Sequence, residues 1–395
     1  VLHEGQAWLA VEYADQGAMA PPMVNSWHKL RDLLVSLLEA LAYAHAHEGL
    51  HRGIAPGDVM MVSSSGARPG AKLYGLLPAS MVGQGELALS VDAQRAHFLA
   101  PEVLLQRWRD LGPASDLYSL GCWAWWMVTG SPPFEGVNDV RGLARAHATS
   151  GLPVFKPAYR MPSGLHAWLL RLLEKNPASR FSSAAHARAS LLEVDRLRNA
   201  GSWRPVLAAM PNHWRREWDS SRDMVLVGTG LGLFSMRPVP VVGRIEERDS
   251  LWAGLRASRE RKSARGACLV GGAGSGKTRL TEWLRHRVIE TGSARVFSVT
   301  HNPMAPPGEA LARLVVEASH CGGLGCDAGS ARMERLLRRE GVTARYEWEA
   351  LTAVMAVAEG WSTDELVTFE RPQDRYVVIA RFLHRCAKRE PLLLV

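Results

Sequence analysis

Lysine is scarce in this chain. Only seven of its 47 basic side chains are lysines, at positions 29, 72, 156, 175, 262, 277 and 388, and the rest are arginines. Chemistry that needs a primary amine therefore has few candidates. The chain of 395 residues still carries a formal charge of +8, and such a surplus is typical of proteins that bind nucleic acid or membrane surfaces.

The positive charge is concentrated in the middle of the chain. Residues 1–195 hold 16 basic and 17 acidic side chains, residues 196–265 hold 14 and 7, and residues 266–395 hold 17 and 15. The surplus thus belongs to an Arg-rich segment that lacks a recognisable helix-turn-helix or zinc module. Nucleic acid is not expected as a partner.

Cysteines and long apolar runs are also few. The five cysteines are an odd number without a dense cluster, which fits a reducing compartment. The longest apolar runs, LGCWAWWMV (120–128) and MVLVGTGLGLF (224–234), are shorter than the ~20 residues of a membrane helix. Because no signal-peptide pattern opens the chain, we expect a cytoplasmic protein without a membrane span.

What is present is an ordinary folded composition, with 47% hydrophobic and 22% charged residues. At ~150 residues per domain, the length predicts two or three domains. Residues 196–240 are rich in Arg, Trp, Gly and Pro, which indicates a linker. After it, ACLVGG (267–272), TRLTEWLRHRVIE (278–290) and RVFSVT (295–300) alternate strand, helix and strand patterns, as in α/β domains.

The strongest single motif is GGAGSGKT, which fits the P-loop pattern G-x-x-x-x-G-K-S/T between a predicted strand and a predicted helix. In such a loop, successive backbone N–H groups and the helix N-terminus point at phosphate oxygens. Lys277 supplies a cation for the terminal phosphates, and the Thr278 hydroxyl is a ligand for Mg²⁺. The alternative, a plain glycine-rich turn, is disfavoured because both residues are in place. The predicted nucleotide-binding residues are Gly271, Gly272, Ala273, Gly274, Ser275, Gly276, Lys277 and Thr278.

The segment VPVVGRIEERDSLW (239–252) precedes this loop by about thirty residues. It resembles the beginning of the bacterial AAA and STAND-type ATPase domain, where a Val-Gly-Arg turn packs beside adenine. The matching residues are Val242, Gly243 and Arg244. The resemblance implies ATP and Mg²⁺ as cofactors and allows an oligomer through this domain. The final REPLLLV resembles the strand of that family that ends in metal-binding acids, cut off before those acids.

Residues 1–195 resemble the Ser/Thr protein kinase family. AWLAVEYADQGAM (7–19) resembles the strand and hinge that receive adenine, and LRDLLVSLLEALAYAHAHEGLHRGIAPGDVMMV (30–62) follows the helix and catalytic-loop pattern. An Ala-Pro-Glu element and a buried helix come later in the expected order. The residues in register are Tyr43, His45, Gly49, His51, Arg52, Pro56, Ala100, Pro101, Glu102, Asp116 and Arg180. The resemblance implies that Glu102 and Arg180 pair to hold the lobe together.

The residues that carry phosphoryl transfer are missing from the matching positions. A kinase needs an Asp that receives the substrate proton, an Asn for one Mg²⁺ and the Asp of Asp-Phe-Gly for the metals. Here these positions hold Gly53, Asp58 and Gly75, and Ala55 replaces the loop lysine. Glycine offers neither a proton acceptor nor a metal ligand, so we predict a pseudokinase-like domain with no catalytic residues. Asp58 alone remains as a candidate to hold a cation.

The N-terminal lobe of a kinase has no counterpart in the sequence. No Gly-rich loop, strand lysine or partner glutamate precedes residue 7, and the first lysine is Lys29. Either the chain is a fragment that begins inside a domain, or the gene product is decayed. The Val at the start and the strand pattern at the end favour a fragment.

Two sets of side chains have structural interpretations that outweigh functional ones. His45 and His51 lie at kinase-fold positions, where packing and hydrogen bonding are more frequent roles than metal binding. Trp123, Trp125 and Trp126 lie in an apolar helix pattern, so core packing is favoured over a stacking platform for single strands.

We therefore predict a multidomain chain. It comprises a mainly α, protein kinase-like C-terminal lobe (1–195), a basic linker (196–240) and a truncated α/β P-loop NTPase domain of the AAA/STAND type (241–395). The leading function is a bacterial signalling protein in which the kinase-like domain binds protein partners and the P-loop domain is an ATP-dependent switch. The alternatives are an active Ser/Thr kinase in the full-length protein and a STAND-type transcription regulator. Whether ATP is hydrolysed is left open by the sequence.

Overall fold

The computed structural model describes residues 2–3, 6–7, 13–64, 70–75, 77–78, 93–194, 241, 243–302, 304–362 and 366–395. These residues fall into two compact units, one up to residue 194 and one from residue 241 onward. The predicted linker over 196–240 lies outside the described residues. No helix within the described ranges is long and apolar enough to cross a bilayer.

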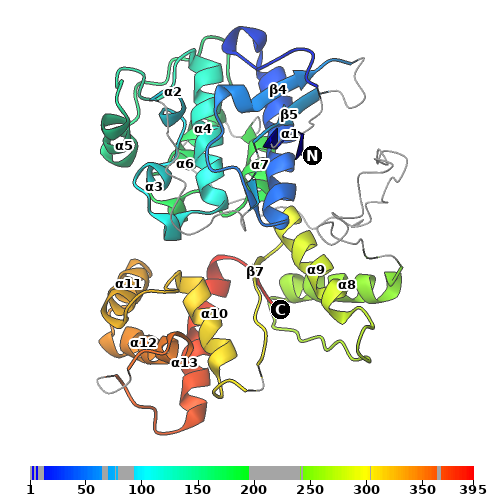
Figure 1. Cartoon of the computed structure of the whole chain (residues 1–395), viewed down its shortest axis with the longest axis vertical. Helices are drawn as coiled ribbons and strands as arrows, with labels where there is room; N and C mark the ends of the chain where they lie inside the picture. Colours follow the sequence, from blue (N-terminus) through cyan, green and yellow to red (C-terminus); the bar gives the residue numbers. More distant parts are fainter. Residues whose placement is uncertain are drawn as a thin grey trace. The chain divides into compact units, whose positions relative to one another are not determined.

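The first unit is mainly helical (Figure 1). Its α-helices are α1 (Trp27–Ala46), α2 (Ala93–Ala96), α3 (Pro101–Leu104), α4 (Pro113–Thr129), α5 (Val140–Thr149), α6 (Ser163–Leu172) and α7 (Ala184–Leu192). Short strands form antiparallel pairs: β1 (Leu2–His3) with β2 (Gln6–Ala7), β3 (Gly49–Leu50) with β6 (Leu77–Pro78), and β4 (Val59–Val62) with β5 (Gly70–Leu73). Single 3-10 turns occur at Pro21–Met23, Pro56–Asp58, Trp108–Asp110 and Pro177–Ser179.

Helix α4 is the buried centre of this unit. It is apolar on nearly all sides, which is the pattern of a helix enclosed by others. It begins with Pro113 in its first turn and ends at Gly130, whose φ of 86° is a left-handed conformation that favours glycine. Trp123 and Trp125 lie fully inside the core and Trp126 packs against it, so the predicted packing role of these tryptophans is confirmed.

Helix α1 supplies the second large part of the core. Ser26 caps its first turn by accepting a hydrogen bond from the backbone N–H of Lys29 at 3.5 Å. Leucines recur along one face at helical spacing and are buried, and α1 packs against α7. These leucines are Leu30, Leu33, Leu34, Leu37, Leu38 and Leu41. The strong periodicity of this segment explains why its helix is predictable from the sequence.

The second unit combines helices with one parallel strand pair. Its helices are α8 (Ile245–Arg261), α9 (Lys277–Thr291), α10 (Glu309–Ser319), α11 (Cys326–Arg339), α12 (Arg345–Glu359) and α13 (Pro372–Arg389). Strand β7 (Arg295–Phe297) pairs in parallel with β8 (Leu392–Leu394). One apolar cluster joins α10, α11, α12 and α13, and a smaller one joins α8 and α9 through Trp252, Leu284 and Val288.

The predicted helix over 278–290 is present as α9, and the predicted strand over 295–300 is present only in its first half, as β7. The predicted strand over 267–272 is wrong. These residues form no regular structure, and Val270 is 90% exposed. The physical reason is that a strand needs a partner for its backbone groups, and in the described part of the chain none pairs with this segment.

Candidate functional site

Asp116 in α4 holds the backbone of the loop at 51–58 in place. Its buried carboxylate accepts hydrogen bonds from the backbone N–H of His51 at 2.8 Å (Oδ2) and of Arg52 at 2.6 Å (Oδ1). His45 Nε2 lies 2.9 Å from Asp116 Oδ2, and His51 Nε2 lies 2.6 Å from the carbonyl oxygen of Tyr74. Both histidines therefore serve the loop structurally, as the sequence predicts.

Glu102 and Arg180 form a buried ion pair with two parallel hydrogen bonds. Arg180 Nη1 donates to Glu102 Oε1 at 2.6 Å and Nη2 donates to Oε2 at 2.9 Å. Ser115 Oγ donates to the same carboxylate at 2.7 Å, and Arg180 also bonds to the backbone carbonyls of Ala114 and Glu174. Every charged atom of the pair has a partner, which is the condition under which a buried pair is tolerated. The predicted pairing is confirmed.

Gly53 lies at the position where the kinase resemblance of the sequence places a proton-accepting aspartate. A Cβ atom added there would lie 2.1 Å from Cδ2 of Leu99, a side chain that is 1% exposed. The space of the missing acid is thus filled by the core. Gly75, at the position of the metal-binding aspartate, has a φ of 83°, where an L side chain is strained.

Asp58, the remaining acid of the loop, is already paired. Arg95 Nη2 donates to Asp58 Oδ2 at 2.8 Å and to the carbonyl oxygen of Gly53 at 2.9 Å, and Arg95 Nη1 lies 3.4 Å from Asp58 Oδ1. The backbone N–H of Ala55 donates to Oδ2 at 2.8 Å. The sequence does not predict this role of Arg95. Its only signal is its place on the segment that runs into the Ala-Pro-Glu element, and that place does not reveal the side chain's partner.

The glycine-rich loop at 271–278 leads directly into α9. Gly274 (φ 74°) and Gly276 (φ 85°) adopt left-handed conformations that favour glycine. Lys277 Nζ donates to the carbonyl oxygens of Gly271 at 2.8 Å and Gly272 at 2.7 Å. The ammonium group therefore lies at the start of the loop. The first backbone N–H groups of α9, which have no partner within the helix, lie at the end of the loop.

The structure brings the turn at 243–244 to this loop. Arg244 Nη2 donates to the carbonyl oxygen of Ser275 at 2.7 Å, and Arg244 Nη1 pairs with Glu247 at 3.0 Å. Val242, the third residue predicted for this turn, lies outside the described residues. Two motifs that are about thirty residues apart in the sequence thus share one surface of the second unit.

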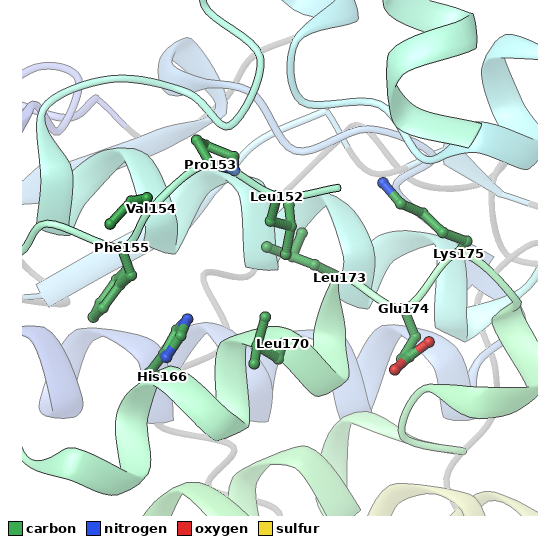
Figure 2. A pocket seen from close by; sticks show the side chains of 9 residues that line it. All are labelled: Leu152, Pro153, Val154, Phe155, His166, Leu170, Leu173, Glu174 and Lys175. Carbon is green, nitrogen blue, oxygen red and sulfur yellow. The ribbon is translucent and has the colours of Figure 1, made fainter. Parts of the chain in front are cut away.

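A pocket of about 600 Å³ lies in the first unit, between the segment at 152–155 and α6 (Figure 2). It is lined by Leu152, Pro153, Val154, Phe155, His166, Leu170, Leu173, Glu174 and Lys175. The rings of Phe155 and His166 stack with centroids 4.7 Å apart. Lys175 points its amine away from Glu174 (Figure 2) and toward Phe134, whose ring centroid is 4.9 Å from Nζ. The mostly apolar lining does not assemble a nucleophile with a base.

A buried histidine contacts α4 beside this region. Tyr118 Oη and His147 Nδ1 are 2.9 Å apart, and both side chains are fully buried. Burial lowers the pKa of His147 to about 3, so its imidazole is neutral in the folded protein. Burial raises the pKa of Tyr118 and lowers that of Lys175. Tyr118 and His147 therefore contribute to packing in the core and do not form an acid–base pair that faces solvent.

The first unit is similar in sequence to known protein kinases. The protein kinase domain family matches residues 2–191. The chain is 27% identical over 164 residues to the serine/threonine-protein kinase PknB of Mycolicibacterium smegmatis, which covers 41% of this chain and 26% of the relative. It is 31% identical over 173 residues to the serine/threonine-protein kinase PknK of Mycobacterium bovis, covering 43% of this chain and 15% of the relative. The chain thus spans less than a third of the length of these relatives.

Proposed function

We propose that the chain is an ATP-binding signalling protein whose kinase domain does not transfer phosphate, since the protein kinase domain family matches residues 2–191 and this part of the chain is related to bacterial Ser/Thr kinases. In this proposal the kinase domain is a scaffold for protein partners. The loop at 271–278, with the turn at 243–244, binds ATP and Mg²⁺ and acts as the switch.

The observation that carries the non-catalytic role is the environment of Gly53. A general base must lie within hydrogen-bond reach of the proton that it accepts. The position has no side chain, and a Cβ there would overlap Leu99. Asp58 is not a substitute, because Arg95 and the backbone N–H of Ala55 already engage its carboxylate.

The nucleotide-binding role rests on the motif and on local geometry. The loop ends at the N-terminus of α9, where backbone N–H groups favour an anion. Lys277 is the one lysine within the loop, and Thr278 is exposed at the second position of the helix. Arg244 ties the neighbouring turn to Ser275. These residues fit a phosphate chain, and Thr278 would supply a hydroxyl to its metal.

A switch of this kind needs only that ATP binds two conformations with different affinity. The ligand shifts the equilibrium by no more than that difference, and phosphate transfer is not required. A kinase domain without its catalytic acids can still take part in such a switch, since binding a protein partner does not require phosphate transfer.

The proposed nucleotide site is tested by measuring ATP binding to the whole chain carrying Lys277→Ala. We expect the affinity for ATP to fall by at least about tenfold, because a charge-assisted contact to phosphate is lost. Lys388→Ala is the matched control, since Lys388 is an exposed lysine on α13 of the same unit, and it should leave the affinity unchanged. Titration calorimetry measures both. Equal affinities of the two variants would contradict the proposed site.

An active Ser/Thr kinase is the second candidate, and the names of the related proteins favour it. Transfer of labelled phosphate from ATP to the chain or to an added protein distinguishes the two. We expect none in the parent chain. Transfer that survives Lys277→Ala would show that the kinase domain is active and would overturn the scaffold role.

A further inference from the structure

The kinase family generally uses Mg²⁺ to hold ATP, but the residues at the loop 51–58 and at Gly75 do not fit a divalent metal. Mg²⁺ prefers oxygen ligands in near-octahedral geometry and is usually held by carboxylates. Of the loop positions that could provide them, Gly53 and Gly75 have no side chain. Across the part of the chain that the structure describes, no group of three or more His, Cys, Asp or Glu residues is placed to hold a metal ion.

A cation nevertheless faces Asp58, and it belongs to the chain itself. The Arg95 guanidinium donates to both carboxylate oxygens, at 2.8 Å and 3.4 Å, and reaches the carbonyl oxygen of Gly53 at 2.9 Å. The Asp58 side chain is only 13% exposed. Arginine cannot lose its proton in proteins, so this charge is permanent.

The pair also joins two segments that lie apart in the sequence. Asp58 is the last residue of the 3-10 turn Pro56–Asp58, with which the loop at 51–58 ends, and its backbone carbonyl accepts a hydrogen bond from the N–H of Tyr74 at 2.8 Å. Arg95 lies in α2, just before the Ala-Pro-Glu element that the buried Glu102–Arg180 pair holds. One guanidinium thus connects the loop to the segment that leads into the anchored part of the unit.

We propose that Arg95 is the built-in cation of the loop at 51–58: it takes the charge position of a metal at Asp58, excludes divalent cations from that carboxylate, and locks the segment at 93–102 to the loop. The inference goes beyond the proposed function and does not depend on nucleotide binding at 271–278. It concerns the first unit alone.

The first experiment measures metal binding with manganese(II) alone as the probe. All variants are the whole chain carrying Lys277→Ala, and no nucleotide is added, so that the loop at 271–278 holds no phosphate-bound metal. The electron paramagnetic resonance signal of free manganese reports binding. We expect the same binding curve with and without Asp58→Asn. A stoichiometric manganese site that Asp58→Asn removes would overturn the proposal.

The second experiment measures the lock by amide hydrogen exchange in the same background. With Arg95→Gln, we expect exchange of the amides at 53–59 and 93–99 to accelerate about tenfold or more, because a charge-assisted bond is lost. Asp58→Asn should accelerate the same amides. The effect of the double variant should be clearly smaller than the sum of the two single effects, since both changes remove the Arg95–Asp58 pair. Exchange within α1 should stay unchanged, which verifies that each variant folds.

The control is the exposed pair Arg31–Asp32 on α1, in which Arg31 Nη2 lies 3.1 Å from Asp32 Oδ1. Arg31→Gln should leave exchange at 53–59 and 93–99 unchanged. Strictly additive effects of Arg95→Gln and Asp58→Asn, or unchanged exchange in both, would show that the pair is not a lock and would overturn this part of the proposal.

Discussion

Two glycines on the loop at 51–58 differ in the space around their α-carbons. A Cβ at Gly53 would lie 2.1 Å from Leu99 Cδ2, whereas a Cβ at Gly57 would have no atom within 4 Å. We expect Gly53→Ala to lower the free energy of unfolding by about 1–3 kcal/mol, because the new Cβ would overpack against Leu99 and because the φ of 157° at Gly53 is one that L side chains rarely adopt. Gly57→Ala should change it by less than about 0.5 kcal/mol. Urea unfolding of the whole chain, monitored by tryptophan fluorescence, measures both.

The stability of Gly53→Ala also indicates whether an aspartate would fit at this position, because aspartate contains the same Cβ as alanine. If Gly53→Ala were as stable as Gly57→Ala, the position would be open, and an acid could be restored without rebuilding the core around Leu99. The absence of an acid at this position would then be a single-residue difference rather than one to which the neighbouring side chains are fitted.

The Glu102–Arg180 pair is the residue-scale feature with the largest expected effect on stability. Glu102→Ala leaves a buried guanidinium without its carboxylate, and we expect the free energy of unfolding to fall by about 3–5 kcal/mol. The exposed pair Arg188–Glu39, with side chains 37% and 50% exposed, is the matched control. Glu39→Ala should cost about 0–1 kcal/mol. Similar losses in both variants would refute the buried pair's structural role.

At the scale of elements, the contact of α5 with α4 is sensitive to pH. His147 is buried and its pKa is lowered to about 3 from 6.5, so below pH 6.5 the unfolded chain binds a proton that the folded chain does not. The free energy of unfolding therefore rises with pH between about 3 and 6.5, by up to about 1.4 kcal/mol per pH unit, and His147 adds no slope above that window.

His147→Gln tests this element contact, because an amide can still bond to Tyr118 but does not titrate in this range. We expect a shallower rise of the unfolding free energy between pH 4 and pH 6.5 than in the parent chain. Burial also lowers the pKa of His97, so part of the slope should remain. An unaltered slope in His147→Gln would exclude the assigned protonation state.

At the scale of the whole molecule, the chain comprises two units with separate cores. Separate cores unfold in separate cooperative transitions unless they are strongly coupled. We expect differential scanning calorimetry to resolve two transitions. ATP at about 100 times its dissociation constant should stabilise one of them by about 2.7 kcal/mol. Glu102→Ala should lower the other. A shift of both transitions by ATP, abolished by Lys277→Ala, would instead indicate coupling between the units.

Much of the first unit follows from the sequence, because its signals are local. The leucine periodicity of α1, the apolar run of α4 and the order of the kinase motifs identify the fold, and the match over residues 2–191 agrees. The sequence alone shows glycine, at Gly53 and Gly75, where the kinase resemblance places catalytic and metal-binding acids. The assignment of residues 241–395 to the α/β P-loop class stays a prediction, as does the nucleotide site.

The tertiary structure alone decided how the gaps left by the missing acids are filled. Leu99 occupies the space beside Gly53, and Arg95 reaches Asp58 from 37 positions along the chain. It also decided that residues 267–272 form no strand, although their composition favours one. The reason is the same in each case: helix periodicity and glycine chemistry act within a few residues, whereas packing, ion pairing and strand pairing depend on partners that folding brings from distant parts of the chain.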